Sequence, residues 1–98
     1  MKVLHGRFKW AKSREEYEEG AVPLAKEIAK AMGLRWKVWG YDDEESMATG
    51  IYLFDDLESL NKYVAWLQGM GPIDGVVDFD MKVWDVQEGL SKITRAPL

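Results

Sequence analysis

The sequence predicts an α+β domain built from four strands and two helices. Four segments alternate between apolar and polar residues or are rich in β-branched and aromatic residues, as strands are: residues 2–10, 34–40, 48–54 and 76–86. Two segments with apolar residues at helical spacing separate the first strand from the second and the third from the fourth. The chain has 98 residues, so we expect one domain over residues 1–98.

The first helix is expected to begin after Ser13, because Ser13 and Glu16 form an S-x-x-E capping box. Its expected C-terminal stop is Gly33. Pro23 lies within the helix, and proline removes a backbone hydrogen bond and clashes with the preceding turn, so we expect a kink or break near Gly20–Pro23. The apolar stripe of this helix comprises Tyr17, Ala21, Leu24, Ile28 and Ala31 or Met32.

The second half of the chain follows the same logic. The polar stretch GYDDEESM predicts a hairpin loop between the second and third strands. Asp55 and Glu58 resemble a second helix cap, and QGMGPIDG ends that helix. Residues 88–93 are expected to form a short helical turn. The order β-α-β-β-α-β predicts a ferredoxin-like fold, with a four-stranded antiparallel sheet and two helices on one face.

Alternation assigns the strand side chains to two faces. The face beneath the helices is expected to hold Leu4, Phe8, Leu34, Trp36, Val38, Ile51, Leu53, Val77, Phe79, Met81 and Val83. The other face is expected to hold His5, Arg7, Lys9, Arg35, Lys37, Trp39, Tyr52, Phe54, Asp78, Asp80, Lys82 and Trp84. There, Asp78 and Asp80 can pair with Arg7 or Lys9. The four aromatic residues of this face would form an exposed patch, which predicts a homodimer packed sheet against sheet.

Composition excludes several classes of protein. The net charge of −4 argues against a partner that is nucleic acid or an anionic membrane surface. The chain has no cysteine, which excludes disulfides, thiolate metal sites and cysteine nucleophiles. It also has no apolar run long enough to span a membrane and no signal-type apolar segment near its start. A soluble cytoplasmic protein is the expectation.

Three stretches, GLRWKVW, GIYLF and MKVWDV, resemble in that order the YdhR-like mono-oxygenases of the dimeric α+β barrel superfamily. LHGRF, PLAKEI and DVQEGLSKI also fit, and the resemblance is tightest over residues 33–54 and 81–93. It implies a ferredoxin-like protomer that pairs sheet to sheet into a barrel, with a small pocket in each protomer. It also implies an oxidoreductase, since better-characterised barrel relatives oxidise aromatic compounds without a cofactor.

The expected cofactor is none. His5 is the only histidine, so one chain lacks the second histidine of a 2-His-1-carboxylate iron site, and a dimer pools two copies only near its axis. Haem remains a minor alternative, because some relatives in the superfamily bind it and His5 is the one candidate histidine ligand. No glycine-rich phosphate loop precedes a helix, which argues against a nucleotide cofactor.

Cofactor-free oxygenation needs a base, a hydrogen-bond donor for the developing oxyanion and a dry aromatic box. His5 is the expected base, since imidazole exchanges protons near neutral pH, and Tyr52 is the expected donor. If His5 is the base, His5→Gln should abolish turnover while the fold and dimer persist. The residues expected to bind the substrate are Trp36, Trp39, Trp66 and Trp84.

Each of these residues also has a structural alternative. His5 can be an ordinary strand residue, Trp36 and Trp66 can belong to the core, and Trp39 and Trp84 can pack the dimer. Two functional hypotheses therefore stay open. One is a cofactor-independent mono-oxygenase acting on a small aromatic or quinol-like molecule. The other is a non-catalytic, homodimeric domain that binds small hydrophobic ligands or is associated with stress. Convergence of His5 and Tyr52 in one pocket would favour catalysis, and an all-apolar cavity would favour binding.

Overall fold

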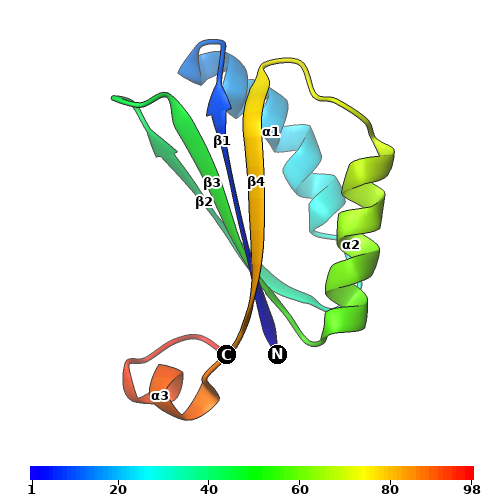
Figure 1. Cartoon of the computed structure of the whole chain (residues 1–98), viewed down its shortest axis with the longest axis vertical. Coiled ribbons are helices and arrows are strands. Elements are labelled where there is room, and N and C mark those ends of the chain that lie inside the picture. The colour runs from blue at the N-terminus through cyan, green and yellow to red at the C-terminus, as the bar shows by residue number, and fades with distance from the viewer.

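The computed structural model describes residues 1–98 and shows a layer of helices packed against one β-sheet (Figure 1). The elements follow the chain as β1 (Lys2–Trp10), α1 (Arg14–Ile28), β2 (Leu34–Asp42), β3 (Met47–Phe54), α2 (Leu57–Gly69), β4 (Val76–Asp85) and α3 (Glu88–Ile93). The strands lie in the order β2-β3-β1-β4, and every neighbouring pair is antiparallel. The predicted ferredoxin-like order is confirmed, and α3 occupies the expected short helical turn.

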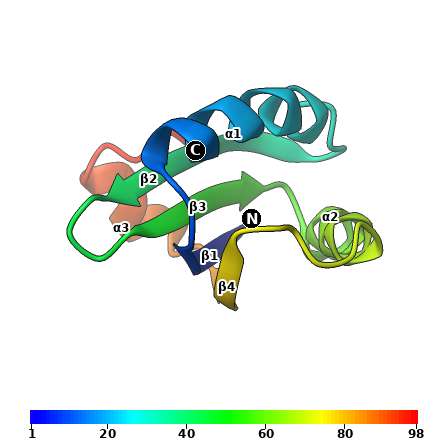
Figure 2. The ribbon, with the colours of Figure 1, turned by 90° about the horizontal axis from the view of Figure 1, so that it is seen from above.

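The two long helices lie on the same side of the twisted sheet, as the view from above shows (Figure 2). The short helix α3 lies away from both, beyond the end of β4. After α3 the chain returns to β2, at the far edge of the sheet, where the indole Nε1 of Trp36 donates to the carbonyl oxygen of Pro97 at 2.6 Å. None of the helices combines the length and apolar character that crossing a bilayer requires.

The core lies between the sheet and the two long helices. Its buried members come from β1, β3 and both helices: Leu4, Ile28, Tyr52, Phe54, Leu60 and Tyr63. Burying a side chain of this size contributes roughly 1.5–3 kcal/mol, so these six residues hold the helices on the sheet. Two of the six are tyrosines, which need hydrogen-bond partners when they are buried.

Helix α1 begins as predicted, since the Oγ of Ser13 accepts from the backbone N–H of Glu16 at 3.1 Å. Of the kink or break expected near Gly20–Pro23, the break is wrong, because α1 runs through Pro23 without interruption. Pro23 and Glu19 are both exposed, so the Glu19 carbonyl that loses its helical partner faces solvent. The helix also ends before Gly33, which leaves Ala31 and Met32 outside it.

The turn that follows α1 depends on Gly33. Its φ of +79° lies in the left-handed region, and a Cβ there would meet the Oγ of Ser59 at 2.3 Å. Helix α2 is capped one residue later than predicted, because Asp56 accepts from the backbone N–H of Ser59 at 2.7 Å. Asp55 instead forms an ion pair with Arg35.

Strand β3 presents the face opposite to the one expected. Tyr52 pairs with Leu4 across β1, and directly paired residues share a face. Because Leu4 is buried beneath the helices, Tyr52 and Phe54 lie on that covered face too, and both belong to the core. The residues predicted to lie under the helices therefore point to the uncovered face: Ile51 and Leu53.

Strand β2 is reversed for a related reason. Leu34 pairs with Phe54 on the covered face, as predicted, but a register shift follows between Leu34 and Trp36. The extra residue of this bulge inverts the alternation of every residue after it. The covered face consequently receives Lys37 and Trp39, whereas the uncovered face receives Trp36 and Val38.

Strand β4 carries a second bulge. The register with β1 shifts between Arg7 and Lys9, and Asp78 has a φ of 55°. Val77 consequently pairs with Lys9 on the uncovered face instead of packing under the helices. The predicted pairing of Asp80 with Arg7 is confirmed, with 3.5 Å between Oδ2 and Nε. The other β4 residues predicted for the covered face lie there: Phe79, Met81 and Val83.

Candidate active site

A cavity of about 40 Å³, here called the inner cavity, lies between the covered face of the sheet and the two long helices. Its walls are mainly aromatic and come from all four strands and α1: Phe8, Trp39, Tyr52, Phe79 and Tyr17. Leu67 of α2 and Met81 of β4 complete the apolar lining, and Lys37 contributes a charged side chain.

Two glycines give the inner cavity its space. Gly6 and Gly50 pair across β1 and β3, the central strands, and both face the helices. At Gly50 a Cβ would lie 2.8 Å from the Cε of Lys37, which would have to move, and 3.1 Å from the Cε1 of Tyr52, which is a tight contact. At Gly6 a Cβ would come no nearer than 3.8 Å to any atom. Gly50 is therefore what allows the Lys37 side chain to fold over the sheet.

The amine of Lys37 is held by aromatic rings. Its Nζ lies 3.2 Å from the ring centroid of Trp39 and 4.5 Å from that of Tyr52. Among the eight ion pairs of the structure, none involves Lys37. The rings contribute cation–π attraction but no hydrogen-bond acceptor of the kind a carboxylate supplies.

Burial lowers the pKa of the Lys37 amine to about 7, because removal from water penalises the charged form. The electron-rich faces of Trp39 and Tyr52 act in the opposite direction and favour the cation. Near neutral pH, therefore, both the neutral and the charged form of this amine are accessible. A lysine in such a state can accept or return a proton.

Behind the amine, two tyrosines share a hydrogen bond. The hydroxyl oxygens of Tyr52 and Tyr63 lie 2.8 Å apart, and either one can be the donor. Burial raises the pKa of both phenols, so both remain protonated at neutral pH. Only one of the two protons is used within the pair, which leaves one O–H free to donate to a ligand.

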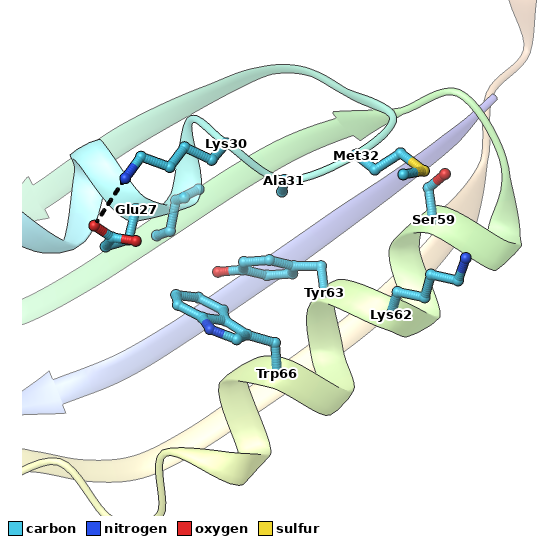
Figure 3. Close-up of a pocket in the computed structure, with 9 residues that line it drawn as sticks. Glu27, Lys30, Ala31, Met32, Ser59, Lys62, Tyr63 and Trp66 are labelled. Carbon is cyan, nitrogen blue, oxygen red and sulfur yellow. Dashed lines mark hydrogen bonds and ion pairs between the residues drawn. The ribbon is translucent and has the colours of Figure 1, made fainter.

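A second cavity of about 260 Å³, the outer cavity, lies between α2 and the segment that closes α1 (Figure 3). The rings of Tyr63 and Trp66 lie side by side within it, with 5.8 Å between their centroids. Lys30 and Lys62 also line it, and Lys30 is paired with Glu27 at 3.2 Å. Tyr63 belongs to the outer cavity and bonds to Tyr52 of the inner one, so the tyrosine pair connects the two.

The structure brings together some of the predicted site residues. Trp39 and Tyr52 line the inner cavity, and Trp66 lines the outer cavity. Trp36 and Trp84 lie on the uncovered face of the sheet, where they pair with Leu53 and Val3. Those two indoles are therefore separated by the sheet from both cavities.

His5 and Tyr52 do not converge. His5 pairs with Ile51 and Lys82, so it lies on the uncovered face, whereas Tyr52 lies on the covered one. The Nε2 of His5 is 2.9 Å from the Oγ1 of Thr49, and that hydroxyl donates its own proton to the carbonyl of Gly6 at 2.8 Å. The Thr49 oxygen must then accept from His5, which assigns the proton to Nε2.

Sequence reasoning missed Lys37 as a site residue, together with Tyr17 and Tyr63. The available signal was the WKVW stretch, in which a lysine sits in a strand whose neighbours on both sides are aromatic or apolar. A two-residue alternation cannot reveal the bulge that turns Lys37 toward the helices. Tyr63 lies within the second predicted helix, and helical spacing does not show that its hydroxyl has a buried partner.

Known structures with the same architecture include oxygenases. A mutant of SnoaB from Streptomyces nogalater, described as a cofactor-independent oxygenase, matches with a TM-score of 0.72 at 12% identity over 88% of this chain and 92% of that one. A "putative antibiotic biosynthesis monooxygenase" from Deinococcus radiodurans matches with a TM-score of 0.63 at 14% identity, over 88% and 92%. Rv0793 from Mycobacterium tuberculosis matches with a TM-score of 0.67 at 9% identity, over 87% and 93%. At these identities the likeness establishes the fold.

A search of curated proteins found no match to the sequence. The family comparison is decisive instead, because one family described as "Putative mono-oxygenase ydhR" matches residues 3–97. That match spans nearly the entire chain, including all four strands and all three helices. The chain therefore belongs to the ydhR mono-oxygenase family.

Proposed function

We propose that this protein is a cofactor-independent mono-oxygenase that oxidises a small aromatic or quinol-like compound. The observation that carries the proposal is the inner cavity, where an amine and a tyrosine hydroxyl lie among aromatic walls. An all-apolar cavity would instead suit simple binding. Membership of a mono-oxygenase family supports the reaction class, and the description of SnoaB as a cofactor-independent oxygenase supports the absence of a cofactor.

The chemistry requires that the substrate itself supply the electrons. A hydroquinone loses a proton, and its anion passes one electron to dioxygen, which gives a substrate radical and superoxide. These two combine into a peroxide, and loss of water from the peroxide leaves a new carbonyl oxygen on the ring. For naphthohydroquinone, one molecule and one dioxygen would give one hydroxynaphthoquinone and one water. The protein has to hold the anion, donate a hydrogen bond to it and exclude bulk water.

The two cavities suit different parts of such a substrate. About 40 Å³ holds roughly three water-sized groups, so the inner cavity can take dioxygen or a reacting hydroxyl but not a whole ring. About 260 Å³ in the outer cavity approaches the size of ordinary small-molecule sites. Tyr63 and Trp66 offer aromatic faces there. We therefore propose that the ring occupies the outer cavity and that its reacting hydroxyl reaches past the tyrosine pair into the inner cavity.

The test is oxygen uptake with naphthohydroquinone as the probe, with dioxygen labelled with oxygen-18. We expect uptake above the rate in buffer alone, and one labelled oxygen atom in the hydroxynaphthoquinone product. Production of unlabelled naphthoquinone with hydrogen peroxide would identify an oxidase and contradict the proposal. Quenching of tryptophan fluorescence without oxygen uptake would favour the non-catalytic ligand-binding domain for this compound.

We also propose that two copies associate through their uncovered sheet faces. An apolar row formed by Trp36, Leu53, Val3 and Trp84 crosses all four strands on that face. Leu53 is fully buried within the chain, so the surface open to a second copy comes from the outer strands, Val38 of β2 and Trp84 of β4. Trp84 is 54% exposed and Val38 is 55% exposed, which is unusual for large apolar side chains gathered on one surface of a monomer. A two-fold axis would let each patch cover its own copy.

A further inference from the structure

We propose that the side-chain amine of Lys37 is the proton acceptor of the inner cavity, and that it takes the proton from the acidic hydroxyl of a phenol or hydroquinone. The inference rests on the proposed function for its class of substrate. It assigns to Lys37 the role that the sequence had suggested for His5. It would make Lys37 a catalytic residue, since the amine would touch the reacting oxygen.

The lining of the inner cavity offers no competing acceptor. No carboxylate lines it. The titratable groups that face it are tyrosines, Tyr17 from α1 and Tyr52 from β3, with Tyr63 of α2 behind Tyr52. Strands β1 and β4 contribute only uncharged groups there. Burial raises the pKa of all three tyrosines, so they serve as donors at neutral pH.

The amine is suited to receive a proton near neutral pH. Without a carboxylate partner it is held by Trp39 and Tyr52, and burial lowers its pKa to about 7. A neutral amine is present in useful amounts near pH 7, unlike that of a solvated lysine. Once protonated, the ammonium would gain cation–π attraction from the Trp39 ring, whose centroid is 3.2 Å away.

The proposed step is a proton transfer and changes no oxidation state. The O–H bond of the phenol breaks, its electron pair stays on the phenolate oxygen, and a new N–H bond forms on the Nζ of Lys37. The ammonium and the phenolate then form an ion pair in a site with little water, where their attraction is strong. The free hydroxyl of the tyrosine pair would donate to the same phenolate oxygen.

The experiment uses naphthol without dioxygen, so that its result does not depend on turnover. Naphthol is neutral in buffer at neutral pH, and its anion absorbs at longer wavelength. At pH 8, where most Lys37 amines are neutral, we expect the anion band to appear when naphthol binds the wild-type protein. We also expect no matching release of protons into a weakly buffered solution that contains a pH indicator, because the proton stays on Lys37.

Three variants make the assignment specific. Lys37→Met keeps a side chain of similar length that cannot accept a proton. The absorbance of the anion band should fall at least about tenfold in this variant, and oxygen uptake should fall by roughly 10²- to 10⁴-fold. Lys82→Met is the matched control, because Lys82 also lies over an indole, that of Trp84, on the uncovered face. It should keep the band. His5→Gln should also keep it, since His5 lies on the uncovered face and does not line the inner cavity, although it bonds to Thr49, which does.

Several results would overturn the proposal. One is the absence of an anion band with the wild-type protein, and another is a band that survives in Lys37→Met. Loss of the band in His5→Gln with its retention in Lys37→Met would make His5 the base. Release of one proton per bound anion would reduce Lys37 to a charge partner. An anion band without oxygen uptake would support Lys37 and contradict only the mono-oxygenase proposal, so the two can fail separately.

Discussion

Lys37 is the residue whose side-chain amine is removed furthest from the water that normally surrounds a charged group. Two aromatic faces contact its amine, and Gly50 supplies the space that lets the side chain lie against the sheet. A lysine is rarely buried without a carboxylate unless the folded state tolerates its neutral form. This tolerance has a thermodynamic consequence, because the same amine is charged in the unfolded chain until pH values near its ordinary pKa of 10.5.

The first prediction concerns stability against pH. Between pH 7 and 9 the unfolded chain holds the Lys37 proton, whereas most of the folded chain has released it, since its folded pKa is about 7. Stability rises with pH wherever the unfolded state binds more protons. The free energy of unfolding of the wild type, relative to Lys37→Met, should therefore rise by about 2 kcal/mol from pH 7 to 9.

Urea unfolding followed by tryptophan fluorescence at each pH would measure this difference. Comparing the two proteins cancels the contributions of the tyrosines, whose raised pKa values would lower stability only at higher pH. A difference that does not change with pH would mean that Lys37 stays charged in the folded protein.

Among the elements, β1 and β3 decide where the cavity lies. Both are central strands, and the paired glycines Gly6 and Gly50 remove side chains from the middle of the covered face. The flanking rings of Phe8 and Tyr52 remain on either side, which leaves a hollow with aromatic walls. The inner cavity is thus a product of strand pairing, which places two short residues opposite each other.

The two glycines should respond differently to alanine. Gly50→Ala places a Cβ 2.8 Å from the Lys37 Cε, so the amine must move, and we expect a loss of about 1–3 kcal/mol in stability together with weaker naphthol deprotonation. Gly6→Ala meets its nearest atom, the Cγ of Met81, at 3.8 Å, which is an ordinary contact. Its stability should stay close to that of the wild type.

Chemical unfolding and the naphthol absorbance band would test this pair of variants. Equal loss of stability in both would show that strand geometry, rather than the crowding of Lys37, limits what each position accepts. An unchanged anion band in Gly50→Ala would show that the amine does not depend on the space above Gly50.

The elements themselves were predictable from the sequence, and their orientation in the hairpin was not. Helical spacing and alternation place all four strands and both long helices, and the Ser13 capping box locates the start of α1. The stretch IYLF is apolar at every position, so its pattern is compatible with either face. The bulge after Leu34 then reverses β2. That one local irregularity moves Lys37 and Trp39 into the inner cavity. Tyr52 is placed there by its pairing with Leu4, on the face of the sheet opposite to His5.

At the scale of the whole molecule, the sheet has one covered face and one face that bears large apolar side chains. Trp84 and Val38 are more than half exposed there, although the C-terminal segment reaches the same face where Pro97 bonds to Trp36. The polar end of this face carries the Arg7–Asp80 pair. A self-complementary surface of this kind suits a two-fold dimer, in which apolar rows pack together and charges remain at the rim.

Light scattering after size exclusion at micromolar concentration should therefore give the mass of two chains. Val38→Glu should shift the protein to a monomer, because it buries a charge in the proposed interface. Val22→Glu is the control, since Val22 is 56% exposed on α1 and Val38 is 55% exposed on the sheet. A wild-type mass of one chain would contradict the dimer, as would equal dissociation by both substitutions.

The hydrogen bond between Tyr52 and Tyr63 has a direction, and the two directions are not equivalent for the two cavities. When Tyr63 donates to Tyr52, the free proton belongs to Tyr52 and is available to the inner cavity. When the bond reverses, the free proton belongs to Tyr63 and is available to the outer cavity. The pair has one free O–H and cannot offer it to both cavities at once. A ligand that accepts a hydrogen bond from Tyr52 in the inner cavity therefore removes the donor from Tyr63 in the outer cavity, and the reverse also holds.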